Sequence, residues 1–182
     1  MRYSTTQDRE SSTASDIVNN CSQYELESII KRCKLFVNHS DDSNAELISK
    51  AICKARQTEV ISTTTQLRQI LFNVFPNLSN RDQYRKVMKV FMALRITVND
   101  ELLILDKFLE KDPINLLAAN GSMVVLTFHS SEDKIVSDHF RRWQRRKYGE
   151  QVFKKVITPS ELELNENPAS ASAKLRAFVR FQ

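Results

Sequence analysis

One segment constrains the fold of this chain more than any other: an apolar run at residues 124–128 that ends abruptly in five polar residues, 129–133. The run is rich in β-branched side chains, which is typical of a buried parallel strand, and a basic, helix-like segment follows it. In open α/β sheets, ligands gather at the carboxyl ends of the strands. We therefore expect a functional site between Phe128 and Asp133.

The first half of the chain has the apolar periodicity of helices and no strand pattern. Ser22 and Thr63 each begin a capping-box sequence, and Ser15 or Asp16 is expected to cap the first helix. Residues 1–14 are polar and are expected to be flexible. The sequence predicts helices from about residue 15, after residue 22, over residues 45–56 and after residue 63, with a loop at 39–44 and a break at 76–80.

The second half mixes helices with two or three strands, and a sheet of that size with open edges is marginal alone, so this half resembles a piece of a larger sheet. Ser130 and Asp133 resemble the N-cap and third residue of a helix, and Pro159 the first residue of another. The predicted elements are helices over residues 82–109, 114–119 and 130–147, a turn at 120–121, a loop at 165–168, and strands over residues 123–128, 151–157 and 175–181.

The charge balance favours a polyanionic partner. The chain has 182 residues, a formal net charge of +5 and a pI of about 9.2, and such a balance is most often associated with nucleic acid. Residues 134–155 hold eight Lys and Arg against Asp138 and Glu150, with Phe140, Trp143 and Tyr148 among them. Such a segment can bind phosphates and stack on unpaired bases. The alternative is an exposed helix face with a half-buried Trp.

Several site classes are disfavoured by composition. Gly121 and Gly149 are the only two glycines, so no Gly-rich turn of the Rossmann type can form here. The three cysteines contain no Cys-x-x-Cys pair, which argues against a zinc site or a disulfide framework. No apolar run approaches the roughly 20 residues that span a bilayer, so no membrane association is expected. The polar first residues lack the pattern of a targeting signal.

Three ordered stretches of the sequence resemble the RsmH/MraW family of S-adenosyl-L-methionine-dependent methyltransferases of small-subunit ribosomal RNA. They are the stretch from Phe91 to Leu102, the stretch from Phe128 to Val136, and Asn167-Pro168 followed by residues 172–176. Met1-Arg2 looks like the end of a further family segment. The sequence departs from the family pattern at several positions: Met92 stands in place of Gln, Ala119-Asn120 in place of Pro-Gly, and Ala169 and Ala171 in place of Arg.

The resemblance implies the C-terminal part of a class I (Rossmann-like) α/β methyltransferase sheet with a helical insert lobe. The implied domains are a flexible N-terminus at residues 1–14, a helical, RNA-binding insert at 15–90, and the α/β portion at 91–182. It implies N4-methylation of a cytosine, S-adenosyl-L-methionine as cofactor, and small-subunit rRNA or the small ribosomal subunit as partner. The location would be the mitochondrial matrix in a eukaryote or the cytoplasm in a bacterium. The family's cofactor-binding motifs are absent from this sequence, so the alternative is a catalytically inactive RNA-binding or ribosome-assembly protein.

The candidate site residues follow from these patterns and from the resemblance. His129 is a candidate general base because histidine titrates near neutral pH, but an RNA-positioning role is favoured. Arg95 and Asn99 lie four residues apart on the long predicted helix, where they either join it to the sheet or contact substrate. No residue is expected to bind the cofactor. The expected substrate and RNA contacts are Arg95, Asn99, His129, Ser130, Arg141, Arg142, Arg145, Arg146, Asn167, Lys174 and Arg176.

Overall fold

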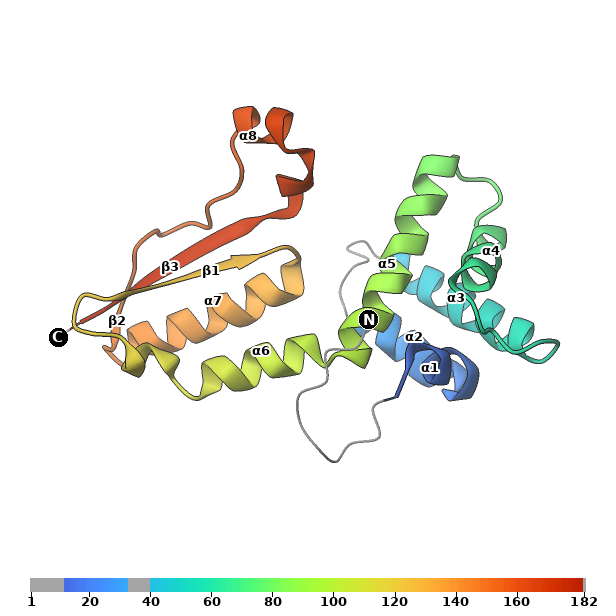
Figure 1. Ribbon diagram of the computed structural model, residues 1–182, viewed down its shortest axis with the longest axis horizontal. Coiled ribbons are helices and arrows are strands. Elements are labelled where there is room, and N and C mark those ends of the chain that lie inside the picture. Colours follow the sequence, from blue (N-terminus) through green and yellow to red (C-terminus); the bar gives the residue numbers. More distant parts are fainter. Residues whose placement is uncertain (1–11, 33–39, 182) are drawn as a thin grey trace. The chain divides into compact units, whose positions relative to one another are not determined.

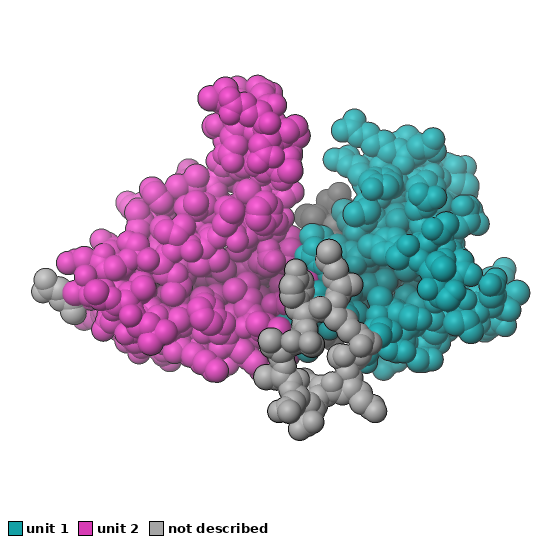
Figure 2. Space-filling view, in the orientation of Figure 1, with its two compact units in different colours: residues 1–100 teal, residues 101–182 magenta. Residues whose placement is uncertain are grey.

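A computed structural model describes residues 12–32 and 40–181, which form two compact units, Met1–Asp100 and Glu101–Gln182 (Figures 1 and 2). The sequence placed the boundary after residue 90, whereas the units divide after Asp100. No helix among the described residues is both long and apolar enough to span a bilayer. Met1-Arg2 and Cys33, which entered the sequence analysis, lie outside the described residues.

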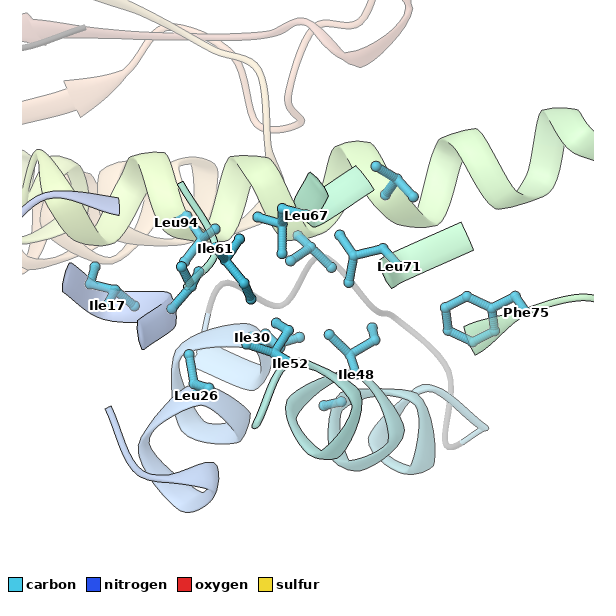
Figure 3. Close-up of a cluster of buried hydrophobic side chains, with 14 residues drawn as sticks. Ile17, Leu26, Ile30, Ile48, Ile52, Ile61, Leu67, Leu71, Phe75 and Leu94 are labelled. Atoms are coloured by element: carbon cyan, nitrogen blue, oxygen red, sulfur yellow. The ribbon is translucent and has the colours of Figure 1, made fainter. Parts of the chain in front are cut away.

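The first unit is helical throughout its described residues, as the apolar periodicity predicted. Side chains spaced three or four residues apart, such as Ile48 with Ile52 and Leu67 with Leu71, put one face of each helix into a shared core (Figure 3). The helices are α1 Ala14–Asn20, α2 Gln23–Arg32, α3 Ser40–Arg56, α4 Thr64–Val74 and α5 Asn80–Val98.

The helix starts of this unit follow local capping chemistry, with two differences from the prediction. The capping boxes at Ser22 and Thr63 are confirmed, because each hydroxyl accepts a hydrogen bond from the backbone N–H three residues later. The first helix is capped by Thr13 rather than by Ser15 or Asp16. The loop predicted for residues 39–44 is wrong from Ser40 onward, where α3 begins. Serine, aspartate and asparagine favour helix starts as well as loops, so composition alone does not separate the two.

The long helix predicted over residues 82–109 is two helices. α5 ends at Val98, and α6 runs over Glu101–Glu110. Between them Asp100 has a φ of 51°, a left-handed conformation that aspartate and asparagine tolerate better than other non-glycine residues. The break was not predicted because apolar periodicity indicates only which side of a segment is buried, and the apolar spacing continues across residues 99–100.

The second unit is a three-stranded sheet covered on one face by helix α7. Every pair in the sheet is antiparallel, in the order β1-β3-β2, so the expectation that residues 123–128 form a parallel strand is wrong. The elements after α6 are the 3₁₀ helix Pro113–Leu116, β1 Ser122–Thr127, α7 Ser130–Arg145, β2 Gly149–Gln151, α8 Glu161–Glu166, the 3₁₀ helix Pro168–Ser172 and β3 Lys174–Arg180 (Figure 1).

The core of this unit lies between the sheet and α7. It combines aliphatic side chains with three fully buried aromatic rings, Phe140, Trp143 and Phe178, whose centroids lie 5.3–5.6 Å apart. The opposite face of β1 is uncovered, because Val124 and Leu126 are 59% and 54% exposed. Strand β1 is therefore buried on one face only, because α7 covers that face and no described element covers the other.

Three smaller elements also differ from the prediction. The strand predicted over residues 151–157 is the short β2 followed by a single bridge from Ile157 to Leu175. Helix α8 is capped by Ser160, so Pro159 precedes the cap rather than opening the helix. α8 also continues to Glu166, into the segment predicted as a loop from residue 165.

Candidate functional site at the carboxyl end of strand β1

The carboxyl end of β1, the first turn of α7 and the start of β3 meet at one end of the sheet. The β1–β3 register places Thr127 opposite Lys174 and Val125 opposite Arg176. The register thereby brings four predicted site residues to this end of the sheet: His129 and Ser130 from the α7 start, and Lys174 and Arg176 from β3. About 45 residues of chain separate the first two from the last two. We call this region the β1-end site, defined by Phe128–Asp133, Lys174 and Arg176.

His129 is the N-cap of α7. Its Nδ1 accepts a hydrogen bond of 3.2 Å from the backbone N–H of Glu132, and the ring is buried. The Glu132 carboxylate in turn accepts hydrogen bonds from the backbone N–H groups of Phe128 and His129. The prediction that Ser130 caps this helix is therefore wrong. The nitrogen that could take a proton from substrate is already committed to the helix, so His129 acts here as a positioning residue.

The same contacts fix the charge of Glu132. Partial burial by itself would raise the pKa of this carboxyl, but hydrogen bonds from the His129 side chain and from the Phe128 backbone N–H outweigh it and hold the pKa below its ordinary value. A carboxylate in the first turn also interacts favourably with the helix dipole. The ionised Glu132 carboxylate thus already occupies the N-terminal end of α7.

Asp133 ties α7 to β3. Its carboxylate accepts two hydrogen bonds from the Arg176 guanidinium, at 2.6 and 3.1 Å, and both side chains are only 15% exposed. The Lys174 ammonium lies 4.0 Å from the same carboxylate and is more exposed. Arg176 is therefore partly buried in an ion pair that joins β3 to α7, whereas Lys174 is more accessible to solvent. Sequence reasoning read Asp133 only as a helix-start residue, because no local pattern relates it to a partner 43 residues away.

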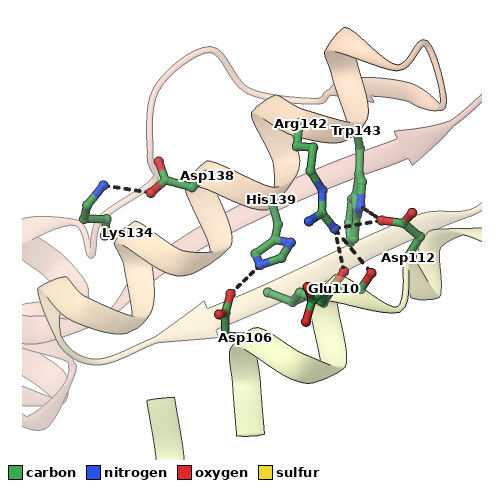
Figure 4. Close-up of polar contacts among 9 residues, drawn as sticks. Asp106, Glu110, Asp112, Lys134, Asp138, His139, Arg142 and Trp143 are labelled. Atoms are coloured by element: carbon green, nitrogen blue, oxygen red, sulfur yellow. Dashed lines mark hydrogen bonds and ion pairs between the residues drawn. The ribbon is translucent and has the colours of Figure 1, made fainter. Parts of the chain in front are cut away.

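Part of the basic surface of α7 is a structural network around Asp112 (Figure 4). The Asp112 carboxylate accepts hydrogen bonds from the Arg142 guanidinium, the Trp143 indole N–H and the Arg146 guanidinium, at 2.9, 2.6 and 3.1 Å. Trp143 is fully buried, which corrects both the half-buried position and the base-stacking role considered for it. Phe140 belongs to the same core. Arg142 and Arg146 therefore hold α7 to the end of α6.

Arg141 and Arg145 lie outside the Asp112 network and face solvent. Arg141 lies 3.6 Å from Asp138 and is 63% exposed, and Asp138 also pairs with Lys134 at 2.7 Å. Arg145 is exposed. Exposed ion pairs of this kind contribute little to stability, about 0–1 kcal/mol, so these side chains are available to an anionic partner at small cost.

A second histidine contact was not foreseen from the sequence. The Nε2 atom of buried His139 lies 2.6 Å from a carboxylate oxygen of Asp106, which joins α7 to α6 (Figure 4). The residues are 33 positions apart, so no spacing rule could have paired them. This contact belongs to the packing of the two helices.

The other predicted contact residues belong to different elements. Asn167 is exposed at the junction of α8 and the following 3₁₀ helix, where its backbone N–H bonds to Glu163 and its carbonyl accepts from Ser170. Arg95 and Asn99 belong to the other unit, where Asn99 ends α5 with its N–H bonded to the Arg95 carbonyl.

The two glycines serve packing and turn formation. A Cβ on Gly149 would lie 1.9 Å from the Val179 carbonyl oxygen, because β2 approaches β3 closely there. A Cβ on Gly121 would lie 2.8 Å from the carbonyl oxygen of Ala118, in the turn before β1. Gly121 and Gly149 therefore do not belong to a glycine-rich turn that could approach a nucleoside ligand.

Comparison with known proteins identifies the relatives. The model of the MraW methylase family matches residues 1–181. Proteins named Ribosomal RNA small subunit methyltransferase H are 40% identical in a Sulfurihydrogenibium species and 41% identical in Persephonella marina, each over 99% of this chain and 58% of the relative. The Borreliella afzelii protein of the same name is 41% identical over 92% of this chain and 53% of its own length. The chain thus spans little more than half of the relatives it matches.

Proposed function

The chain belongs to the MraW methylase family, and from that premise we propose that it forms the rRNA-facing part of an S-adenosylmethionine-dependent methyltransferase that acts on N4 of a cytosine in small-subunit rRNA. The observation that carries the proposal is the family match over residues 1–181, a stretch over which this chain resembles proteins named Ribosomal RNA small subunit methyltransferase H. The geometry of the second unit supports it in three ways.

First, the β1-end site suits a base that has been turned out of its stack. Phe128 is 49% exposed at the end of β1, and an exposed aromatic ring offers a stacking surface to an unpaired base. Ser130 is exposed in the next turn and offers a hydroxyl. His129 and Glu132 hold this turn rigid through the cap. We assign Phe128 and Ser130 to the wall of the cytosine pocket and His129 to its positioning.

Second, three of the predicted basic residues can contact phosphates without breaking the Asp112 network or the Arg176–Asp133 pair. Lys174 lies at the β1-end site, and Arg141 and Arg145 lie on the outer face of α7. Cations that replace counterions at phosphates give affinity that falls steeply with salt. By contrast, Arg142, Arg146 and Arg176 already neutralise Asp112 and Asp133, so we remove them from the proposed RNA contact.

Third, we infer that the methyl donor is bound by protein outside the described residues, because neither Gly121 nor Gly149 forms a glycine-rich turn. S-adenosylmethionine supplies the electrophilic methyl group when bound, and the residues described here would hold and orient the acceptor base. An exocyclic amine loses its proton late in such a transfer, which agrees with a His129 that is committed to capping rather than to proton abstraction.

A second candidate function follows from the same observation on the cofactor. A member of the family that has kept its RNA contacts without catalysis would act as an RNA-binding or ribosome-assembly protein. The structural roles of Gly121 and Gly149 favour this reading over any active site confined to this chain. The two candidates share the RNA contact and differ in methyl transfer.

The RNA contact is tested by salt-dependent binding of the chain to a small-subunit rRNA fragment. The double variant Arg141→Gln/Arg145→Gln should weaken binding, and the slope of log K against log salt should flatten by about 1.5, because each lost phosphate contact removes roughly 0.7–0.9. The matched control, Lys107→Gln/Lys111→Gln, removes the same charge from exposed lysines at the end of α6. Equal slopes for the two double variants would exclude α7 from the interface.

A further inference from the structure

Two cations of β3 lie near one carboxylate of α7. Lys174 and Arg176 are two residues apart on β3, so their side chains leave the same face of the strand. The Arg176 guanidinium donates hydrogen bonds to both oxygens of the Asp133 carboxylate, at 2.6 and 3.1 Å. The Lys174 ammonium lies 4.0 Å from that carboxylate, which is beyond hydrogen-bond length. Asp133 is therefore occupied by Arg176 and not by Lys174.

The chemistry of the two cations explains which of them holds the carboxylate. A guanidinium is planar and presents two N–H groups in the geometry of a carboxylate, whereas an ammonium is a single charge on a flexible stem. The Asp133 and Arg176 side chains are each 15% exposed, and that of Lys174 is 31% exposed. The better-matched and less exposed pair neutralises Asp133, so Lys174 is the cation that is left on the solvent side.

The backbone of Lys174 is fixed at the β1-end site. Lys174 stands opposite Thr127 in the β1–β3 register, and the hydroxyl of buried Thr127 donates a hydrogen bond of 3.3 Å to the Lys174 carbonyl. The ammonium group thus reaches out from a fixed point, one residue pair from the exposed Phe128 ring. Whether the ammonium turns to solvent or to α7 depends on whether Asp133 already has a partner.

We propose that Arg176 is a positioning residue: by occupying Asp133, it leaves the Lys174 ammonium able to bind a backbone phosphate beside the target base. This inference rests on the proposed function, in which Lys174 contacts phosphate, and it gives a role in binding to a residue that does not touch RNA. Without the guanidinium, Asp133 would be a partly buried carboxylate with no partner, which is unfavourable. Lys174 would then turn to Asp133 and leave the phosphate.

The first measurement uses the full chain without RNA. It follows the rate at which the Lys174 amine is acetylated by an N-hydroxysuccinimide ester, read by mass spectrometry. Arg176→Gln should slow this reaction by about threefold, the size expected of a partly exposed ion pair, because Lys174 then pairs with Asp133 and is shielded. Adding Asp133→Asn removes the acceptor, so the double variant Asp133→Asn/Arg176→Gln should regain the parent rate.

The matched control is Arg180→Gln. It removes the same charge from the same face of β3, where the Arg180 guanidinium donates to the backbone carbonyls of Asn115 and Leu117 instead of to an acid. Arg180→Gln should leave the acetylation rate of Lys174 at the parent value.

The second measurement is the slope of log K against log salt for binding to a small-subunit rRNA fragment. Arg176→Gln and Lys174→Gln should each flatten the slope by roughly 0.7–0.9, the loss of one phosphate contact. The double variant Asp133→Asn/Arg176→Gln should restore the parent slope although it lacks the arginine. A purely structural role of Arg176 predicts no such rescue.

Trp143 fluorescence and far-ultraviolet dichroism establish that each variant is folded, and Arg176→Lys, which keeps the charge without the bidentate geometry, replaces Arg176→Gln if the latter unfolds. An unchanged acetylation rate in the Arg176 variant overturns the proposal. So does a rate that falls and is not regained in the double variant, or a slope that stays flat in the double variant. Acetylation rates as predicted, with a slope that Lys174→Gln leaves unchanged, support the role of Arg176 and contradict the phosphate contact of the proposed function.

Discussion

At the scale of single residues, His129 shows how position can suggest catalysis where the structure uses packing and capping. A histidine at the end of a strand is the natural candidate for a base, yet its Nδ1 accepts the backbone N–H of Glu132 and its ring is buried. Histidine is not among the usual capping residues, so Ser130 was the better guess from propensity. The choice between the two neighbours depends on where α7 begins, which sequence patterns locate only to within a few residues.

The cap assignment predicts different costs at these neighbouring positions. His129→Ala should lower the free energy of unfolding of the second unit by about 1 kcal/mol, whereas His129→Asp should retain most of it because aspartate also caps. Ser130→Ala should change it by no more than about 0.5 kcal/mol. Urea unfolding followed by the fluorescence of Trp143, the only tryptophan, measures this. A larger loss for Ser130→Ala than for His129→Ala would contradict the assignment.

Glu132 predicts a dependence of stability on pH. Its pKa is lower in the folded state than its ordinary value of 4.5. The carboxylate therefore stabilises the fold fully above that ordinary value, and this contribution is lost as the pH falls through the lower folded pKa. Unfolding of Glu132→Gln, compared with the parent protein from neutral pH into this acid range, should show a reduced acid loss. Identical pH profiles would show that the hydrogen bonds to Glu132 do not stabilise the fold.

At the scale of elements, contacts between residues close in the sequence were predicted, and contacts between distant residues were not. The capping boxes at Ser22 and Thr63 were predicted, because each operates over three residues. The Asp112 and Asp133 networks were not, because Asp112 lies 30 residues from Arg142 and Asp133 lies 43 from Arg176. The positions of most helices followed from apolar periodicity. The break at Asp100 was missed because the apolar spacing continues across it. The basic residues of α7 were counted correctly, but the sequence could not show which of them already had a carboxylate partner.

Asp112 is the element-scale contact with the clearest predicted cost. Asp112→Ala leaves the buried Trp143 N–H without its acceptor and takes the carboxylate from Arg142 and Arg146, which should destabilise the second unit by about 2–3 kcal/mol. Asp112→Asn keeps an oxygen for Trp143 and tolerates the left-handed backbone, where φ is 51°, so its loss should be smaller. Thermal unfolding of both variants measures the difference. Equal losses would mean that the charge, rather than the indole hydrogen bond, carries the contact.

At the scale of the whole molecule, a small α/β unit was predicted for the second half of the chain and is present. Two or three strands were predicted and three are present, with α7 covering one face. The antiparallel pairing was missed because an apolar, β-branched run is equally compatible with a strand buried on both faces in a larger sheet. The strand end and the helix start that hold Phe128–Asp133 in the β1-end site were predicted, because the apolar run and the helical pattern after it are local signals. The β3 residues that complete it depend on register, which local patterns do not specify.

The central claim, that this chain supplies the acceptor-binding part of an rRNA (cytosine-N4)-methyltransferase, is tested most directly by exchange into a relative. The matched stretch of the Sulfurihydrogenibium protein, 40% identical, is replaced by this chain, and transfer of labelled methyl from S-adenosylmethionine to small-subunit rRNA is measured and mapped. We predict methylation at the same cytosine N4 as in the parent relative. A folded chimera that binds S-adenosylmethionine and the rRNA but transfers no methyl group would contradict the claim and support the RNA-binding alternative.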